Sequence, residues 1–496
     1  MRSRPALIAL LVALALLPAA ACRRDAAAVP PAAPPVPVPP NVQPAAPPGG
    51  EIAPSHQFYG VYISDQKAGF AEEWLRPLPG GGAELETKVT IEIQRLGQRL
   101  KLSLSDRVRY SGGSTGEIAE FETTESMGEG GETVRTGQRT ESGFDVTINA
   151  AGSVSKKTLP FPKERAHDVL GPYLVARLRG AKAPVETWQF DRSTLQDNSV
   201  SMRVANERTM TIQGVKTTVL DIVGTDAKRG LELGSRMTLE GRALEMTVGP
   251  GFKLVLEDEA VAKNPAVQVP DLYRLGVVPA DRSLSPADSV RRLGVKLEGP
   301  PPTLNVDDER QARLDRSSQL TIRSVACADG APSELSAADR AKYLESTPFI
   351  DHEHAAVRAV LASEAPGADL AERLTRRVHR ALRYTLATAP LSASAILTGG
   401  SGDCTEYARA LVALLRASEI PAREVSGMAY SGDGEPGFAF HAWTEAWIGG
   451  RWCSLDPTWD QTTLDATHIA LSRDDPTAIV GLLGGVKATI LEVERR

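Results

Sequence analysis

Cysteine is scarce in this sequence. No Cys-x-x-Cys pair is present, and no Cys/His spacing has the form of a zinc site, so we expect neither a structural zinc nor a redox dithiol. Nothing predicts a cofactor or a bound metal. Each cysteine therefore needs its own explanation, and the four among 496 residues are Cys22, Cys327, Cys404 and Cys453.

The chain also lacks a strong charge of either sign. Its formal net charge is −6 and it has no long run of lysine and arginine, which argues against a nucleic-acid partner. After residue 22, no apolar segment reaches the roughly eighteen residues that a membrane-spanning helix needs. Hydrophobic residues make up 42% and charged residues 24%, as in ordinary globular proteins. The length predicts two or three domains.

The first residues have the pattern of an export signal. Arg2 and Arg4 precede an apolar run at residues 6–17, and small residues then lead to Cys22. The run is too short to span a bilayer comfortably. Because three alanines directly precede the cysteine, the site resembles a bacterial lipoprotein cleavage site. We predict a signal peptide at residues 1–21 and lipidation of Cys22. The alternative is an ordinary secretory signal that is cut after Ala21.

Residues 22–55 form a proline- and alanine-rich linker. This composition cannot bury a core and favours an extended polyproline conformation. We expect a tether that holds the folded part of the chain away from a membrane. The prediction is an exported protein of the cell envelope or periplasm, anchored by an N-terminal lipid.

Residues 56–265 alternate between apolar and polar side chains, as at Val89, Ile91 and Ile93, with short glycine turns between the runs. The alternation predicts antiparallel hairpins with one solvated face. We expect an open, strongly curved antiparallel β domain with a helix at residues 167–178, followed by a connector at residues 266–333. No residue of the β domain is of a type that suggests catalysis, which leaves substrate presentation, the docking of a protein partner or spacing as its role.

From about residue 334 the apolar residues recur at helical spacing. The last of these helices begins at Cys404, and residues 423–455 then have the pattern of strands separated by glycine turns. The predicted fold class is therefore α+β. An N-terminal antiparallel β-rich domain precedes a C-terminal domain at residues 334–496, in which helices pack on an antiparallel sheet.

Three residues of the C-terminal domain point to chemistry. Cys404 follows a glycine-rich turn and opens a helix, where the helix dipole favours a thiolate. His441 and Asp456 follow in the strand region. Cysteine, histidine and aspartate in this order can supply a nucleophile, its base and the group that orients the base. We expect the glycines to allow a sharp turn and leave room for a substrate carbonyl, and the Cys404 N–H to stabilise an oxyanion.

Four short segments give this region a resemblance to the transglutaminase-like superfamily, whose fold is related to that of papain-like cysteine proteases. They are residues 402–408, 420–423, 441–443 and 456–458. The resemblance covers about a third of the chain. As a whole, the chain resembles bacterial exported proteins that have a C-terminal transglutaminase-like domain. It implies that Cys404 is the nucleophile, His441 the base and Asp456 the third member of a catalytic triad.

Residues and resemblance together predict acyl transfer through a Cys404 thioester to a protein or peptide substrate. We favour water as the acceptor, which makes the enzyme a cysteine protease or amidase acting on peptide or isopeptide bonds. One alternative is a protein-glutamine gamma-glutamyltransferase that cross-links proteins. Another is a non-catalytic binding scaffold, against which the intact set of three residues argues.

Two features expected of some family members are missing from the sequence. Animal transglutaminases have an upstream tryptophan as second oxyanion donor, whereas residues 206–403 contain none. Tyr384 is the candidate in its place. Calcium-dependent members carry acidic loops after the catalytic region, and Asp474 and Asp475 are the only such cluster nearby. We therefore expect no metal requirement.

Other residues have a simpler explanation than chemistry. His352 and His354 are two apart at a helix start, so their side chains diverge and a solvated turn is favoured over a metal site. His379 lies among arginines and is expected at the surface. Arg423 and Glu445 are expected in structural roles.

The remaining two cysteines leave one question open. An exported compartment permits a disulfide between Cys327 and Cys453. The sequence does not show whether their Cα atoms come close enough to form one.

Overall fold

The computed structural model of the protein describes residues 52–496 except 96–97, 128–131, 151–152, 213, 227–230, 250, 265–268, 272–274, 299–307, 315–317, 328–331, 386–390, 433–435 and 474–485. The predicted signal peptide, Cys22, almost all of the linker, and Asp474 and Asp475 lie outside the described residues. Within the part described, no helix has the length and apolar character needed to cross a membrane. The chain divides into two compact units, which we call unit 1 (to residue 272) and unit 2 (from residue 273).

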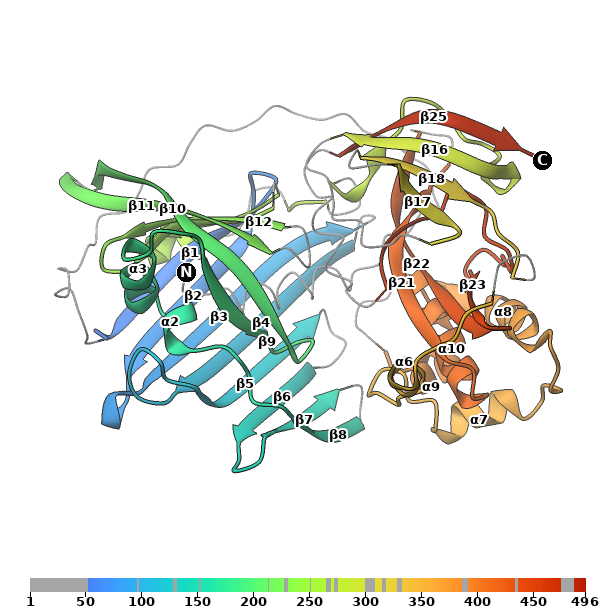
Figure 1. Ribbon diagram of the computed structural model, residues 1–496, viewed down its shortest axis with the longest axis horizontal. Coiled ribbons are helices and arrows are strands. Elements are labelled where there is room, and N and C mark those ends of the chain that lie inside the picture. Colours follow the sequence, from blue (N-terminus) through green and yellow to red (C-terminus); the bar gives the residue numbers. More distant parts are fainter. Residues whose placement is uncertain are drawn as a thin grey trace. The chain divides into compact units, whose positions relative to one another are not determined.

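Unit 1 is built on one sheet of fourteen antiparallel strands (Figure 1). Each strand pairs with its neighbour in sequence from β1 to β8 and again from β9 to β14, and pairing of β1 with β14 joins the two series. The strands are β1 (Ser55–Ile63), β2 (Gln66–Pro77), β3 (Ala83–Arg95), β4 (Gln98–Tyr110), β5 (Ile118–Met127), β6 (Glu132–Arg139), β7 (Phe144–Ala150), β8 (Ser153–Leu159), β9 (Val185–Asp191), β10 (Gln196–Ile212), β11 (Val215–Asp226), β12 (Leu231–Thr238), β13 (Ala243–Val248) and β14 (Phe252–Glu257).

The period-2 pattern of the sequence accounts for this sheet. Ile91 on β3 lies opposite Leu102 on β4 and both are buried, while intervening residues such as Lys101 are exposed. The predicted antiparallel β-rich region is thus confirmed. The helix expected at residues 167–178 is present as two pieces, α2 (Ala166–Val169) and α3 (Gly171–Arg179), and a short helix α4 (Glu259–Ala262) follows β14.

A buried ionic group ties the segment before α2 to the sheet of unit 1. The fully buried Glu164 accepts hydrogen bonds from Tyr110 Oη at 2.5 Å, from the Phe190 N–H at 2.8 Å and from Arg192 Nη2 at 2.8 Å. Arg192 also lies 3.5 Å from Asp106. Since such charges are costly to bury singly, the partners are mutually dependent.

Unit 2 contains two larger antiparallel sheets and a set of helices (Figure 1). One sheet has the order β15-β22-β21-β24, with β23 also paired to β22, and the other has the order β17-β18-β16-β25. A short parallel pair joins β19 to β20. The strands are β15 (Val278–Pro279), β16 (Val290–Glu298), β17 (Gln311–Leu314), β18 (Gln319–Arg323), β19 (Arg383–Tyr384), β20 (Ser401–Gly402), β21 (Ala422–Tyr430), β22 (Gly437–Ile448), β23 (Arg451–Leu455), β24 (Ile469–Ser472) and β25 (Lys487–Arg495).

The helices of unit 2 pack on the first of these sheets. One apolar cluster holds side chains of α7, α8, α9 and α10 together with Ala422, Ala446 and Leu455 of the strands. A second cluster packs β16, β18 and β25 against β21, β22 and β24. The helices are α6 (Ala337–Lys342), α7 (Ala355–Leu361), α8 (Leu370–Ala381), α9 (Ala393–Gly399) and α10 (Cys404–Ala417).

The predicted connector at residues 266–333 differs from what the structure shows. Most of its described part belongs to unit 2, because β15 pairs with β22, and β16 pairs with both β18 and β25. Prolines and glycines interrupt the segment, so its short strands give little periodic signal. Two of the pairings, β15 with β22 and β16 with β25, join residues more than a hundred positions apart in sequence, where no local pattern can indicate them.

Candidate active site

Cys404 is the first residue of α10, and the local sequence fixes that helix start. Asp403 is the N-cap, accepting a hydrogen bond from the Thr405 N–H at 3.1 Å, while Glu406 accepts one from the Asp403 N–H at 3.1 Å. This reciprocal capping box satisfies backbone donors that a helix start leaves open. Burial, and then the nearby Asp403 carboxylate, raises the pKa of Glu406 well above its ordinary value of 4.5.

Two glycines before Cys404 have distinct steric roles. Gly400 ends α9 in the left-handed conformation, at φ 65°, which only glycine adopts easily. At Gly402 a Cβ atom would lie 2.3 Å from Glu406 Cβ. Gly402 thus makes room for the capping box. We had expected the glycines to make room for a substrate carbonyl.

Helix α10 packs against β22, the strand that carries His441. Thr444 Oγ1 donates a hydrogen bond of 3.1 Å to the Ala408 carbonyl, one turn into α10. The Cys404 side chain is buried and is not part of a disulfide. The structure therefore joins α10, one turn after Cys404, to Thr444 of β22.

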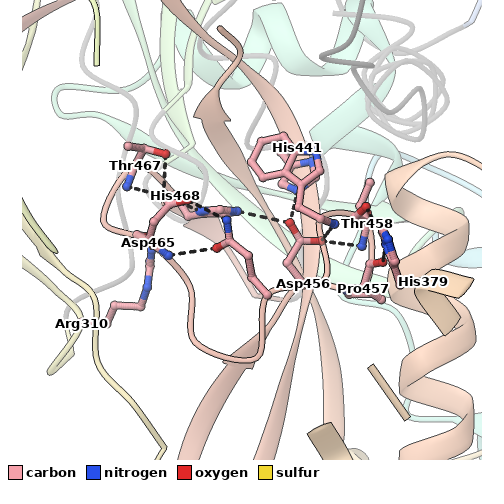
Figure 2. A network of polar contacts seen from close by, with 11 residues as sticks. Arg310, His379, His441, Asp456, Pro457, Thr458, Asp465, Thr467 and His468 are labelled. Carbon is pink, nitrogen blue, oxygen red and sulfur yellow. Dashed lines mark hydrogen bonds and ion pairs between the residues drawn. The ribbon is translucent and has the colours of Figure 1, made fainter. Parts of the chain in front are cut away.

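His441 and Asp456 form a direct hydrogen bond inside unit 2 (Figure 2). The distance from His441 Nε2 to Asp456 Oδ2 is 2.8 Å, and both side chains are buried. The other oxygen, Asp456 Oδ1, accepts the Thr458 N–H at 2.7 Å and the Trp459 N–H at 3.4 Å. Burial alone would raise the pKa of Asp456, but the His441 and His468 rings hold it well below its ordinary value of 3.8. Asp456 is thus a carboxylate.

Aromatic rings fix the orientation of His441. Its ring is stacked on Trp459, with centroids 4.3 Å apart and planes at 12°. Trp443 is fully buried nearby. Gly427, opposite His441 on β21, leaves space for this indole, because a Cβ there would lie 2.4 Å from Trp443 Cη2.

His379 corrects an expectation. We expected it at the surface among arginines, but it is half-buried and its Nδ1 lies 3.2 Å from the carbonyl oxygens of both Pro457 and Thr458 (Figure 2). Carbonyls only accept, so Nδ1 carries a proton and donates it. Helix α8 is thereby attached to the turn that follows Asp456. The apolar spacing of α8 did not indicate this contact, because the partner is backbone.

The site also contains a histidine and an aspartate that sequence reasoning missed. His468 Nε2 lies 3.3 Å from Asp456 Oδ2, and His468 Nδ1 lies 3.1 Å from Asp465 Oδ1. His468 is fully buried and Asp465 nearly so. Both belong to the irregular segment between β23 and β24, where no periodicity marks a buried residue. The one available signal was a histidine twelve residues after Asp456, in a chain with seven histidines.

The charges around His468 shift its pKa and that of Asp465 in opposite directions. Burial would lower the pKa of His468, but Asp465 and Asp456 together raise it above its ordinary value of 6.5. Burial would raise the pKa of Asp465, yet His468 and further hydrogen bonds hold it well below 3.8. The pair thus carries a proton on the imidazole and none on the carboxylate.

Three ligand atoms at this site, from His441, Asp456 and His468, lie within 4.8 Å of one another. That spacing is compatible with a metal ion. However, both imidazole nitrogens already face Asp456 Oδ2 at hydrogen-bond distance, so protons account for the contacts. We assign no metal to these residues.

Part of the predicted connector supports the segment that carries Asp465 and His468. Arg310 Nη2 donates to the Asp465 carbonyl at 2.9 Å. Gln311 bonds both backbone groups of Ala470, donating to its carbonyl at 2.9 Å and accepting its N–H at 2.8 Å. The amide of Gln311 thus binds β24 in the manner of a neighbouring strand.

Arg423 and Glu445 have the structural roles expected of them. Arg423 Nη2 lies 2.7 Å from Glu445 Oε2, and Arg473 Nε donates to the same oxygen at 2.9 Å. Burial would raise the pKa of Glu445, but the two arginines lower it. The ion pairs join β21, β22 and the end of β24.

Cys327 and Cys453 form a disulfide, with Cα atoms 5.1 Å apart. The structure thus answers the question that the sequence left open, and the bond links the segment after β18 to β23.

Two other residues singled out in the sequence lie elsewhere. His354 caps α7 by accepting the Ala356 N–H at 3.2 Å, which agrees with a helix start. Tyr384 is 36% exposed on β19, with its ring 6.2 Å from that of Tyr407. Its role as an oxyanion donor stays a prediction.

Comparison with known proteins identifies the region around these residues. Residues 354–457 match the model of the transglutaminase-like superfamily. Over 101 residues the chain is 36% identical to an uncharacterized protein of Mycobacterium leprae, covering 18% of this chain and 36% of that relative. Over 111 residues it is 35% identical to a protein-glutamine gamma-glutamyltransferase of Pseudomonas aeruginosa, covering 20% of this chain and 16% of that relative.

The chain thus spans about a third of the first relative and about a sixth of the second. A crystal structure of a domain of unknown function from Brucella abortus is 11% identical, with a TM-score of 0.34, and the match covers 42% of this chain and 96% of that one. Residues 354–457, which contain Cys404, His441 and Asp456, are thus the part of the chain that matches the transglutaminase-like superfamily.

Proposed function

We propose that unit 2 is a cysteine-dependent enzyme that hydrolyses peptide or isopeptide bonds. Cys404 is its nucleophile, His441 its base and Asp456 the carboxylate that orients the base. The observation that carries the proposal is the buried 2.8 Å hydrogen bond between His441 and Asp456. His441 lies on β22, and β22 packs against α10, the helix that begins at Cys404. This arrangement is the one expected of a papain-like fold.

The hydrogen bond defines which ring nitrogen takes part in the reaction. Asp456 is ionised and can only accept, so Nε2 of His441 carries a proton. Nδ1 is then the nitrogen that takes the thiol proton of Cys404 and later gives it up. Stacking on Trp459 holds the ring plane.

The reaction then has two balanced halves. The Cys404 thiolate attacks the amide carbonyl, and the Cys404 N–H stabilises the oxyanion that forms. The C–N bond breaks as His441 protonates the leaving amine, which leaves a thioester on Cys404. Water, deprotonated by His441, attacks the thioester, and the acid and the thiol are released.

A second candidate function differs only in the acceptor of the acyl group. An amine in place of water gives an isopeptide cross-link between glutamine and lysine side chains. The observation in its favour is the 35% identity over 111 residues to a protein named as a protein-glutamine gamma-glutamyltransferase. The absence of a tryptophan between residues 206 and 403 supports hydrolysis instead.

One experiment distinguishes the two acceptors. The purified protein is incubated with casein and a dansylated primary amine, with Cys404→Ala as the control, and products are read by mass spectrometry. Cleavage or glutamine deamidation that depends on Cys404 is expected. Cys404-dependent incorporation of the amine would instead establish the second candidate. Identical spectra from both proteins across a panel of substrates would contradict an enzymatic role.

We further infer that the protein is exported and anchored through a lipid on Cys22. The disulfide between Cys327 and Cys453 supports this proposal, because such bonds persist in oxidising compartments. The test is metabolic labelling of cells with an alkyne-bearing palmitate analogue, followed by fractionation. Wild type is expected in the membrane fraction with label, and Cys22→Ser without label. Equal labelling of both would contradict the assignment.

A further inference from the structure

We propose that His468 and Asp465 are positioning residues that hold Asp456 ionised and directed at His441, so that the catalytic chain runs Cys404, His441, Asp456, His468, Asp465. This inference rests on the proposed function of unit 2. It assigns a role to two residues that lie outside the region matched by the superfamily, which ends at residue 457.

The first support is the geometry around Asp456 Oδ2. This one oxygen receives two imidazoles, His441 Nε2 at 2.8 Å and His468 Nε2 at 3.3 Å (Figure 2). The two rings lie 5.5 Å apart, at 59°. The carboxylate is therefore held between a histidine that takes part in the proposed reaction and one that does not.

The second support is that His468 is itself fixed from its other side. Its Nδ1 faces Asp465 Oδ1 at 3.1 Å, and the same oxygen accepts the Thr467 N–H at 2.8 Å and the Thr467 hydroxyl at 2.6 Å. Asp465 Oδ2 accepts Gln461 Nε2 at 2.8 Å. Asp465 is thus tied down by its neighbours and can orient the ring.

The proton count follows from these contacts. Both ring nitrogens of His468 face carboxylate oxygens, which can only accept, so both nitrogens must donate and the ring is an imidazolium. It is completely buried, with Trp443 and Trp459 packed against it edge to face. Such a charge is tolerated inside a protein only when paired, and here it has a carboxylate at each end.

The surrounding charges do not provide a second explanation for the imidazolium. His441 on β22 and Asp456, just after β23, face it. From the segment before β24, Asp465 faces it. Arg310, just before β17, donates to the Asp465 carbonyl and is attracted by the Asp465 carboxylate, and His379 of α8 reaches the carbonyls of residues 457 and 458. Among the described residues, the charges at hydrogen-bond distance from the ring are the two carboxylates.

The imidazolium has a consequence for the thiol. A positive charge behind Asp456 offsets part of the carboxylate's negative potential in a region of low dielectric. A thiolate at Cys404 is stabilised by that charge. Loss of His468 therefore moves the acid limb of the pH–activity profile, where the thiolate forms, to higher pH.

The test uses the full-length protein and needs no substrate. Thiolate is followed by its absorbance at 240 nm across a pH titration, as the difference between each protein and its Cys404→Ala counterpart. His468→Gln is expected to move the onset of thiolate to higher pH, with about a tenfold loss of thiolate at a fixed pH on the rising limb. An unchanged onset would overturn the inference.

A matched control separates positioning from structure. Gln461→Leu also removes a hydrogen bond to Asp465 but keeps both charges, so its melting temperature falls while its thiolate onset stays in place. Equal shifts in the two variants would mean that loosening of the segment, rather than charge, is responsible, and would overturn the inference.

A double-mutant cycle tests the pair. Asp465→Asn is expected to shift the onset in the same direction as His468→Gln, and the double variant should shift it no further than His468→Gln alone. Additive shifts would contradict a joint role. If His468→Gln does not fold, Asp465→Asn carries the test.

The protonation of His468 can be observed directly. Correlation of ring nitrogens and carbon-bound protons in ¹⁵N-histidine-labelled protein, with seven histidines to assign, should show one ring that stays doubly protonated above the ordinary histidine pKa of 6.5 and whose signals vanish in His468→Gln. A singly protonated His468 at neutral pH would overturn the inference. If His468 is an imidazolium but Cys404 titrates like an exposed thiol in wild type, the proposed function fails instead.

Discussion

Asp456 uses two oxygen atoms to accept four hydrogen bonds, two from imidazoles and two from the backbone of the turn that follows it. At the scale of single residues this carboxylate connects His441, His468 and the turn that carries Trp459. It fixes the tautomer of His441, closes the turn that places Trp459 on the His441 ring, and shares a proton donor with Asp465.

Replacement of Asp456 by asparagine tests that central position. The amide keeps the shape of the side chain but carries no charge and presents an N–H toward at least one imidazole. We expect the Cys404-dependent activity to fall by about 10²- to 10⁴-fold, with the melting temperature as a control for folding. A loss of less than about fivefold in a folded variant would show that Asp456 does not orient the base.

At this scale the sequence indicated some residues and not others. Cys404, His441 and Asp456 stand in short motifs whose residue types suggest chemistry by themselves. His468 and Asp465 stand in no motif, and their significance comes from a three-dimensional contact with Asp456. His379 was placed at the surface because its neighbours in sequence are arginines, whereas its partners are carbonyls 78 and 79 residues away.

At the scale of elements, α10 is the helix that positions the thiol. Its start is fixed by Asp403 and Glu406, its second turn is joined to β22 through Thr444, and its apolar side chains fill the cluster shared with α7, α8 and α9. The sequence predicted the start of this helix at Cys404 correctly, because a glycine-rich turn and apolar spacing are local signals.

Two glycines near the start of α10 give a matched pair of substitutions. Gly402→Ala places a Cβ 2.3 Å from Glu406 Cβ, so the capping box must move, and we expect a loss of about 1–3 kcal/mol in the free energy of unfolding. Gly399→Ala meets no atom within 4 Å and lies in α9, so a change between zero and a gain of about 1 kcal/mol is expected. Denaturant titration measures both. A larger loss from Gly399→Ala than from Gly402→Ala would contradict the steric account.

The small strands of unit 2 could not be predicted with the same success. A β17 of four residues has no measurable period, and its role depends on Gln311 meeting Ala470, which is 159 residues away. By contrast, the long strands of unit 1 have a clear alternation, and their pairing is with the next strand in sequence. The local sequence pattern is therefore sufficient to predict the long strands of unit 1 but not the short strands of unit 2.

At the scale of the whole molecule, the ionisation of the His468 pair predicts a dependence of stability on pH. The pKa values of Asp456 and Asp465 are lowered in the fold, so their stabilisation is present above pH 3.8 and is lost as pH falls. The pKa of His468 is raised, so its stabilisation is present below pH 6.5 and is lost as pH rises through the folded-state value.

The measurement is the melting temperature of wild type and of His468→Gln between pH 6 and 9. Wild type should lose more stability over this range than the variant does, because the variant has no imidazolium to deprotonate. Glu406, whose pKa is also raised, contributes equally to both proteins and cancels in the comparison. Parallel curves would mean that His468 is neutral in the fold.

The disulfide acts over a large part of unit 2. Cys327 and Cys453 are separated by 126 residues in sequence, and closing a loop of this length restricts the unfolded chain strongly. Replacing both cysteines by alanine should cost about 3–5 kcal/mol and lower the melting transition of unit 2 by roughly 10 °C. Calorimetry of this variant, with wild type in reducing buffer as the comparison, tests the estimate. An unchanged transition would contradict it.

Gln311, described above as a side chain that bonds β24 like a neighbouring strand, sets a limit on how this catalyst can be excised or grafted. A fragment cut to residues 354–457 would retain Cys404, His441 and Asp456 but lose Gln311, Arg310, His468 and Asp465, and with them everything that holds the far side of Asp456. The smallest fragment that keeps the site intact therefore begins before β15 and continues through β25. It is about twice as long as residues 354–457, the region that matches the superfamily.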